Sequence, residues 1–262
     1  MKPPLTYYGG KQKLADRIIS MMPVHRIYCE PFFGGGAVFF AKTPVEIEVI
    51  SDINGELINF YKVLKNDYKK LNKEIKATLH SREEHQIAEV VLKYPKLFSE
   101  VKRAWAVWTL ANQSYASRLG GTWRCDFKDN STSKKLINKR NNFTEEYAKR
   151  LEQVQIDNRD AIKVIQLWDT KESFFYLDPP YFNSNMGHYK GYTEQGFEDL
   201  LKTLSVIKGK FILSYYEDPL IRELYSKYRI IEKEAVKHSC GVTRFSKGNE
   251  KPKSKELLIM NY

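Results

Sequence analysis

The chain has 262 residues, 42% hydrophobic and 29% charged, a balance that is typical of globular proteins and excludes disordered and fibrous ones. Its 43 Lys and Arg residues exceed its 32 Asp and Glu residues, so the net charge is +11 and a polyanionic partner is expected. No apolar run approaches the roughly 20 residues of a membrane span and the three cysteines lie far apart, which predicts a cytoplasmic protein with neither a membrane segment nor a disulfide framework.

Short apolar runs alternate with amphipathic segments along most of the chain. Apolar residues recur at helical spacing within three segments, at 14–21, 57–64 and 197–204. Short apolar runs predict strands at 27–29, 45–50, 154–156, 173–177, 210–215, 229–236 and 256–262. Strands and helices that alternate in this way indicate an α/β fold with a mostly parallel sheet, and the last two strands are expected to form an antiparallel hairpin.

The stretch from 68 to 150 interrupts this alternation, because it is helical, basic and ends in loops, with GGTW at 120–123 and DNSTSKK at 129–135. We therefore expect a mainly helical domain inserted into the α/β fold. The predicted division is a first catalytic part at 1–67, the insertion at 68–150 and a second catalytic part at 151–262.

Charge is concentrated in this insertion. Residues 101–140 hold nine basic and two acidic residues, interleaved with Trp105, Trp108, Tyr115, Trp123 and Phe127. Basic groups neutralise phosphates and aromatic faces stack on bases, so the mixture favours a nucleic-acid surface. Trp105 and Trp108 are three residues apart, however, which favours the core side of a helix for these two.

Two of the predicted strands are followed by residue types that bind ligands. The first runs into Gly34-Gly35-Gly36, where glycines let the backbone turn sharply and approach a ligand, although most such loops are ordinary turns. The second ends at Asp52, which is suited to accept hydrogen bonds from ribose hydroxyls beyond the carboxyl end of a parallel sheet. A helix N-cap for the segment that opens at Asn54 is the open alternative for Asp52.

The strand at 173–177 runs directly into Asp178-Pro179-Pro180-Tyr181. Consecutive prolines fix φ and keep the residue before each of them extended, so the Asp178 carboxylate and the Pro179 carbonyl are expected to face one point. Both oxygens accept hydrogen bonds and the Tyr181 ring adds an aromatic face, which suits a planar amino group. A rigid strand-to-loop turn is the alternative for a bare Asp-Pro-Pro sequence.

In their order along the chain, these motifs resemble those of the Dam-type adenine-N6 DNA methyltransferases. The segments that carry the resemblance are TYYGGKQKL at 6–14, EPFFGGGAVF at 30–39, SDINGELINFY at 51–61, NRDA at 158–161, LDPPY at 177–181 and KSKELLIMNY at 253–262. The resemblance implies a Rossmann-like methyltransferase fold with S-adenosylmethionine as the cofactor. It also implies that the cofactor is bound by Tyr7, Lys11, Gly34, Gly36, Asp52, Asp160 and Asp178.

The reaction that the resemblance implies is direct methyl transfer to N6 of an adenine flipped out of duplex DNA. Asp178 and the Pro179 carbonyl would accept hydrogen bonds from the N6 amine, Pro180 would keep the turn rigid, and Tyr181 would stack on the base. No Pro-Cys pair occurs, which counts against cytosine-C5 methylation through a cysteine nucleophile. The five histidines show no ligand spacing, so no metal is expected.

Within the insertion, SYASRLGGTWRCDF at 114–127 resembles the base-contacting region of the same family. Arg118, Trp123 and Arg124 are the predicted DNA contacts, because Arg pairs bidentately with guanine and Trp wedges or stacks. A phosphate contact or a core position is the alternative for each. Lys134 and Lys135, in a predicted polar loop, are expected to contact phosphates.

Two other functions stay open on the sequence alone. The same motif could act on adenine in RNA, whose helix geometry and 2′-hydroxyl differ from those of DNA. The chain could also be a catalytically silent nucleic-acid-binding protein on this scaffold, because a fold does not guarantee activity. The expected partners are double-stranded DNA and, within a restriction-modification system, a cognate restriction endonuclease, with the chain itself a monomer.

Overall fold

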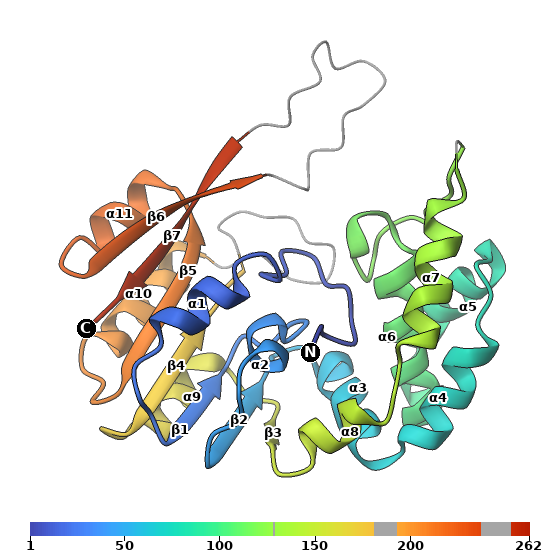
Figure 1. Ribbon diagram of the computed structural model, residues 1–262, viewed down its shortest axis with the longest axis horizontal. Helices are drawn as coiled ribbons and strands as arrows, with labels where there is room; N and C mark the ends of the chain where they lie inside the picture. Colours follow the sequence, from blue (N-terminus) through green and yellow to red (C-terminus); the bar gives the residue numbers. More distant parts are fainter. Residues whose placement is uncertain (128, 181–192, 237–252) are drawn as a thin grey trace.

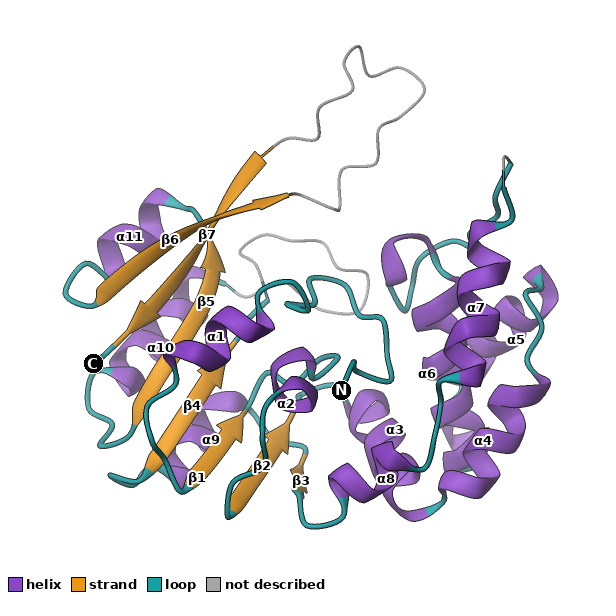
Figure 2. Ribbon diagram, viewed as in Figure 1, coloured by secondary structure: helices purple, strands orange, loops and turns teal. Residues whose placement is uncertain are grey.

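A computed structural model describes residues 1–127, 129–180, 193–236 and 253–262 (Figure 1). This part of the chain forms a sheet flanked by helices and, beside it, a group of further helices (Figure 2). None of the helices in the described ranges combines the length and the apolar character needed to cross a lipid bilayer.

Seven strands form one sheet in the described part of the chain, in the order β3-β2-β1-β4-β5-β7-β6. Neighbours from β3 to β5 pair in parallel, and β7 pairs antiparallel with both β5 and β6. The strand order reverses between β1 and β4, and ligands bind beyond the carboxyl ends of the strands at such a switch point. The bounds are Ile27–Glu30 (β1), Ile47–Ser51 (β2), Gln155–Asp157 (β3), Ser173–Leu177 (β4), Lys210–Tyr216 (β5), Arg229–Val236 (β6) and Lys253–Met260 (β7).

The strand predictions and the α/β class with a C-terminal antiparallel hairpin are confirmed. The central strands lack polar alternation because helices cover both faces of the sheet, and β4 is buried along its whole length. The largest difference is in the last strand, which begins at Lys253 rather than at Glu256.

Helices cover both faces of the sheet (Figure 2). On one face, Ile18, Val38 and Leu57 pack into one hydrophobic cluster, and on the other Val164, Leu200 and Ile221 pack into a second. The three predicted amphipathic segments are confirmed as α1, α3 and α10. The bounds are Ala15–Met21 (α1), Ala37–Ala41 (α2) and Gly55–Asn66 (α3) on the first face, and Ala161–Trp168 (α9), Glu194–Leu204 (α10) and Pro219–Leu224 (α11) on the second.

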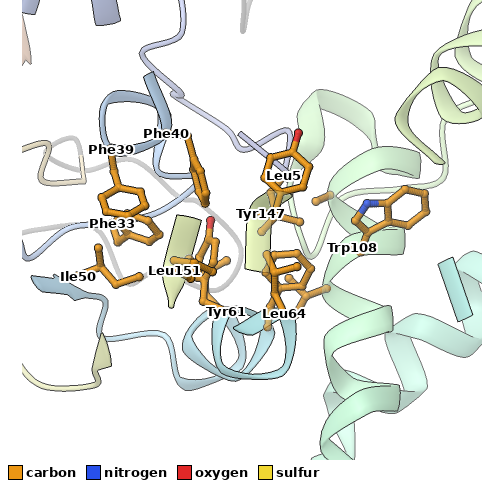
Figure 3. Packing of buried hydrophobic residues seen from close by; sticks show 14 of the residues in the cluster. Leu5, Phe33, Phe39, Phe40, Ile50, Tyr61, Leu64, Trp108, Tyr147 and Leu151 are labelled. Carbon is orange, nitrogen blue, oxygen red and sulfur yellow. The ribbon is translucent and has the colours of Figure 1, made fainter. Parts of the chain in front are cut away.

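The helices between α3 and β3 stand mostly beside the sheet (Figure 1). Their bounds are Tyr68–Ala77 (α4), Arg82–Lys93 (α5), Glu100–Gln113 (α6), Ser131–Asn141 (α7) and Glu146–Leu151 (α8), with short 3₁₀ turns at Pro95–Leu97 and Tyr115–Ser117. Helix α6 packs against α3, α4 and α5. Trp105 and Trp108 of α6 are buried in the same cluster as Leu64 and Tyr147, so the core position expected for the two tryptophans is confirmed. Figure 3 shows Trp108 in this cluster.

The polar loop predicted at 129–135 is wrong, because α7 begins at Ser131 and includes Lys134 and Lys135. Two carboxylates stabilise the start of this helix: Asp129 Oδ1 accepts from the Ser131 N–H at 3.1 Å, and Asp126 accepts from the Thr132 N–H. Such side-chain acceptors satisfy donors that have no partner inside a helix. These local side-chain contacts thus override a composition that favours a loop.

Candidate active site

A cavity of about 280 Å³ opens at the carboxyl ends of β1, β2 and β4. Five separate segments line it: the N-terminal stretch before α1, the glycine loop after β1, the end of β2, the start of α9 and the residues around the end of β4. All the residues predicted to bind a cofactor lie on this lining, namely Tyr7, Lys11, Gly34, Gly36, Asp52, Asp160 and Asp178. Tyr7 and Asp178, which lie 171 positions apart in the sequence, therefore line the same cavity.

The glycine loop takes a backbone path that other residues rarely follow. Gly34 and Gly36 have φ values of +49° and +66°, in the left-handed region that favours glycine. A Cβ atom on Gly36 would lie 2.5 Å from Cζ of Phe33, so even a methyl group there has no room. The Tyr61 hydroxyl donates to the Gly34 carbonyl at 2.9 Å, which fixes the loop against α3.

Asp52 holds the glycine loop and the start of α3 together. Its Oδ2 accepts from the Gly34 N–H and its Oδ1 from the Asn54 N–H, both at 2.9 Å. The N-cap of α3 is Asn54, whose Oδ1 accepts from the N–H groups of Glu56 and Leu57. The helix-cap alternative for Asp52 is therefore wrong, and its carboxylate, 4% exposed, lies at the cavity wall.

Asp160 has a structural contact in addition to its place on the cavity lining. Its Oδ1 accepts from the Ile162 N–H at 3.0 Å and caps the N-terminus of α9. A carboxylate at a helix N-terminus is stabilised there whether or not a ligand is bound.

Asp178 lies at the centre of a buried charged group. Its Oδ1 accepts from Lys11 Nζ at 2.6 Å and from the Ser214 hydroxyl of β5 at 3.3 Å. Lys11 Nζ also forms an ion pair with Glu256 Oε1 of β7 at 3.3 Å. The ammonium thus joins the N-terminal segment to two strands, and we name Lys11, Asp178 and Glu256 the Lys11 triad.

Two buried carboxyl groups at this site have pKa values above the ordinary range. Burial raises the pKa of Glu30 to about 8, and the Tyr28 hydroxyl donates to Glu30 Oε2 at 2.6 Å. Burial, followed by the negative charge of Asp178, also raises the pKa of Glu256, against the opposing effect of Lys11. At neutral pH Glu30 therefore holds its proton in most molecules.

Sequence reasoning missed Glu30, Glu256 and Ser214 as members of the site. A signal existed for Glu30, which directly precedes the PFFGGG sequence at the end of a strand. Glu256 directly precedes the apolar LLIM run of the last strand, a position at which a charged residue is rare unless a partner is near.

Pro179 and Pro180 lie on the cavity lining directly after Asp178. Tyr181, predicted to stack on the base, lies outside the described residues. The described part of this motif, Asp178, Pro179 and Pro180, therefore lies at the cavity that the cofactor residues line.

The predicted DNA-contacting residues Arg118 and Trp123 lie on the loop between α6 and α7. The Arg118 guanidinium stands 4.6 Å from the centre of the Tyr8 ring, and Tyr8 lines the cavity. Trp123 packs beside the His80 ring, with centroids 5.0 Å apart, and its Nε1 donates to Gln113 Oε1 at 3.3 Å. Contacts within the protein thus already hold the indole ring of Trp123.

Arg124, Lys134 and Lys135 surround the start of α7. Arg124 Nε donates to Thr132 Oγ1 at 2.7 Å, which leaves the two terminal nitrogens of its guanidinium for other partners. Lys134 and Lys135 are exposed on α7. The predicted DNA-contacting residues are therefore close in the fold but do not line the cavity at the carboxyl ends of β1, β2 and β4.

Comparisons with known proteins identify the family of the chain. The family model described as D12 class N6 adenine-specific DNA methyltransferase matches residues 7–239. Over its whole length the chain is 29% identical to the Type II methyltransferase M1.LlaDCHI of Lactococcus lactis subsp. cremoris, covering 96% of that protein. It is also 29% identical to the Type II methyltransferase M.MjaIII of Methanocaldococcus jannaschii, again over all of this chain and over 99% of the relative. The DNA adenine methylase of Haemophilus influenzae is 25% identical over 86% of this chain and 83% of its own length.

Proposed function

This chain belongs to the D12 class of N6 adenine-specific DNA methyltransferases, and we propose which of its residues bind the two substrates of that reaction. The cavity at the carboxyl ends of β1, β2 and β4 binds S-adenosylmethionine. Asp178 and Pro179, which follow β4, present the target adenine to this cofactor. The observation that carries this proposal is the meeting of five separate segments at one cavity, with Asp178 and Pro179 on its wall.

The cavity lining suits a cationic cofactor. Three aspartates line it, Asp52, Asp160 and Asp178. Glu30 is mostly protonated and adds little charge, and the Lys11 ammonium is paired with Asp178 and Glu256. Such a lining favours a ligand with a sulfonium and an α-ammonium over one that carries phosphates. When bound there, S-adenosylmethionine supplies a methyl group on its sulfonium.

A carboxylate beyond the carboxyl end of a parallel strand suits the ribose hydroxyls of this cofactor. Asp52 follows β2 directly and lies on the cavity wall. Asp52 therefore takes the ribose. Tyr7, Gly34 and Gly36 border the methionine half, and Asp160 borders the cofactor adenine.

For the target base, Asp178 and the Pro179 carbonyl are the acceptors of the N6 amine. Lys11 and Ser214 both donate to Asp178 Oδ1 and hold the carboxylate in place. Among the described residues, none donates to Oδ2, so this oxygen accepts from the amine. Two acceptors direct the nitrogen lone pair at the methyl group, and catalysis is then mostly positioning of two bound reactants. Pro180 keeps the turn rigid, and Tyr181 stacks on the base.

The duplex is bound by the insertion, which we infer to be a target-recognition domain spanning 68–150 between catalytic parts at 1–67 and 151–262. The adenine is flipped out of the stack at a cost of a few kcal/mol. Arg118, Trp123 and Arg124 contact the DNA beside it, and Lys134 and Lys135 contact phosphates.

We also infer the setting in which the enzyme acts. The printed names of two full-length relatives are those of Type II methyltransferases, so a cognate restriction endonuclease is the proposed partner. The free thiols of Cys29 and Cys125 suit a reducing compartment, the cytoplasm. Methylation of one adenine at a time needs one active site, so the proposed form is a monomer.

Methyl transfer from labelled S-adenosylmethionine to unmethylated genomic DNA tests the proposal. We expect N6-methyladenine in a fixed short context, which single-molecule sequencing of the product identifies. Asp178→Ala abolishes incorporation, whereas Asp199→Ala, an acidic residue on α10 outside the cavity, retains it. Full turnover by a folded Asp178→Ala variant would contradict the roles given to this strand end.

A further inference from the structure

A second cavity, of about 350 Å³, lies between the N-terminal segment and helices α6, α7 and α8. Its charged lining residues are all basic: Lys2, Arg124, Lys135 and Lys139. Among the residues that the structure describes, no Asp or Glu lines this second cavity, whereas acidic side chains line the first cavity. We name this second site the basic cavity.

In the described part of the chain, Lys2, Lys135 and Lys139 lack the carboxylate partners that basic residues elsewhere in the fold have. Arg103 and Arg150 pair with Glu56 and Glu48 at 2.6 and 2.5 Å. In the described ranges, by contrast, no ion pair joins Lys2, Lys135 or Lys139 to a carboxylate. The cavity therefore collects positive charge that the protein itself leaves unbalanced.

The position of Lys139 makes this unbalanced positive charge unfavourable when no anion is bound. Lys139 is half-buried, and burial together with the charge of Lys2 lowers the pKa of its ammonium. Lys135 lies one helical turn before it on the same face of α7, and like charges at this spacing repel. An anion between these ammonium groups would remove the repulsion.

The remaining lining suits a phosphate attached to a larger molecule. Asn138, Asn142 and Ser117 add neutral donors, and Leu136 and Phe143 form an apolar part of the wall. The N-terminal segment that lines this cavity continues through Thr6 to Tyr7, on the lining of the cofactor cavity. The same N-terminal stretch of chain therefore lines both the basic cavity and the cofactor cavity.

We propose that Lys2, Lys135 and Lys139 bind one backbone phosphate of the DNA duplex in the basic cavity. This inference rests on the proposed function, because it takes duplex DNA as the substrate. Lys2 and Lys139 are new DNA contacts, and Lys2 lies outside the insertion, so the N-terminal segment takes part in binding the duplex as well as the cofactor. The contact positions the duplex without reading its sequence.

The salt dependence of DNA binding tests this proposal. Fluorescence anisotropy with a labelled duplex gives Kd over a series of salt concentrations for the full chain and for Lys2→Met, Lys139→Met and a control, Lys73→Met. Methionine keeps an unbranched apolar stem and removes the charge. Lys73 is exposed on α4 and lies outside the basic cavity, so its variant measures the effect of net charge alone.

Each phosphate that the protein neutralises contributes about 0.9 to the slope of log Kd against log salt. We expect Lys2→Met and Lys139→Met each to lower the slope by up to this amount and to weaken binding roughly fivefold at about 0.15 M salt. Lys73→Met should keep the slope of the unmodified chain. Lys2 is exposed, so its variant reports on binding even if Lys139→Met unfolds the protein.

Equal slopes for all variants would overturn the proposal, as would an equal loss in Lys73→Met. Calorimetry with inorganic phosphate distinguishes the source of the anion: submillimolar binding that depends on Lys139 and that duplex DNA does not displace would assign the cavity to a free anion instead. The two proposals fail in different assays. If the proposed function is wrong, methyl transfer is absent while the salt slopes of the lysine variants still differ from that of the unmodified chain.

Discussion

The Lys11 triad allows a direct test of how the active site is held together. Lys11 is 6% exposed and contacts two carboxylates, Asp178 at 2.6 Å and Glu256 at 3.3 Å. The perturbation replaces these acids by their amides, singly as Asp178→Asn and Glu256→Gln, and then together. Each amide keeps the shape of the side chain and removes its charge.

The expected free energies of unfolding follow from which charges stay paired. In either single variant Lys11 keeps one carboxylate, and the loss is about 1 kcal/mol, the size of a typical hydrogen bond. Glu256→Gln is expected to cost less than Asp178→Asn, because burial and the charge of Asp178 already disfavour the ionised form of Glu256. The double variant leaves the buried ammonium without either carboxylate, and breaking a buried pair in this way costs about 3–5 kcal/mol.

Urea unfolding of the four proteins at pH 7 measures this difference as a double-mutant cycle. The predicted coupling energy between Asp178 and Glu256 is about 1–3 kcal/mol, in the direction that makes the double variant less stable than the sum of the single losses. Losses that add within about 0.5 kcal/mol would refute the reasoning, because they would mean that the two acids do not share Lys11.

Three further predictions concern the same end of the sheet. Gly36→Ala should lower the free energy of unfolding by about 2 kcal/mol or more, measured by urea, because φ is +66° and the new methyl group would lie 2.5 Å from Phe33; an unchanged midpoint would contradict that geometry. Asn54→Ala should cost about 1 kcal/mol through loss of the α3 cap, with Asn66→Ala at the other end of the helix as the control. Burial raises the pKa of Glu30 from 4.5 to about 8, so the folded chain keeps a proton that the unfolded chain releases, and stability falls as pH rises through this window. Glu30→Gln should remove up to about 1.4 kcal/mol per pH unit of that fall, seen as a flatter dependence of Tm on pH; an unchanged dependence would show that another group is responsible.

Local sequence determined the strands and the motifs that follow them. The runs at 173–177 and 229–236 match β4 and β6 in their bounds. For β4 the reason is burial on both faces, which demands continuous apolar residues over a few positions. A motif that directly follows a strand is placed at the carboxyl edge of the sheet by connectivity alone. The positions of the glycine loop, Asp52 and Asp178 around one cavity could therefore be predicted without tertiary contacts.

Contacts across long sequence distances were decided only by the tertiary structure. The pairing of Lys11 with Asp178 and Glu256 needs the N-terminal segment, β4 and β7 at a particular register, and no local pattern encodes that register. The basic cavity likewise depends on where Lys2 lies relative to Lys139, which is far from it in the sequence. Local propensity acts over a few residues, whereas the ionisation and partners of a buried charge depend on every group packed around it, and these groups come from distant parts of the chain.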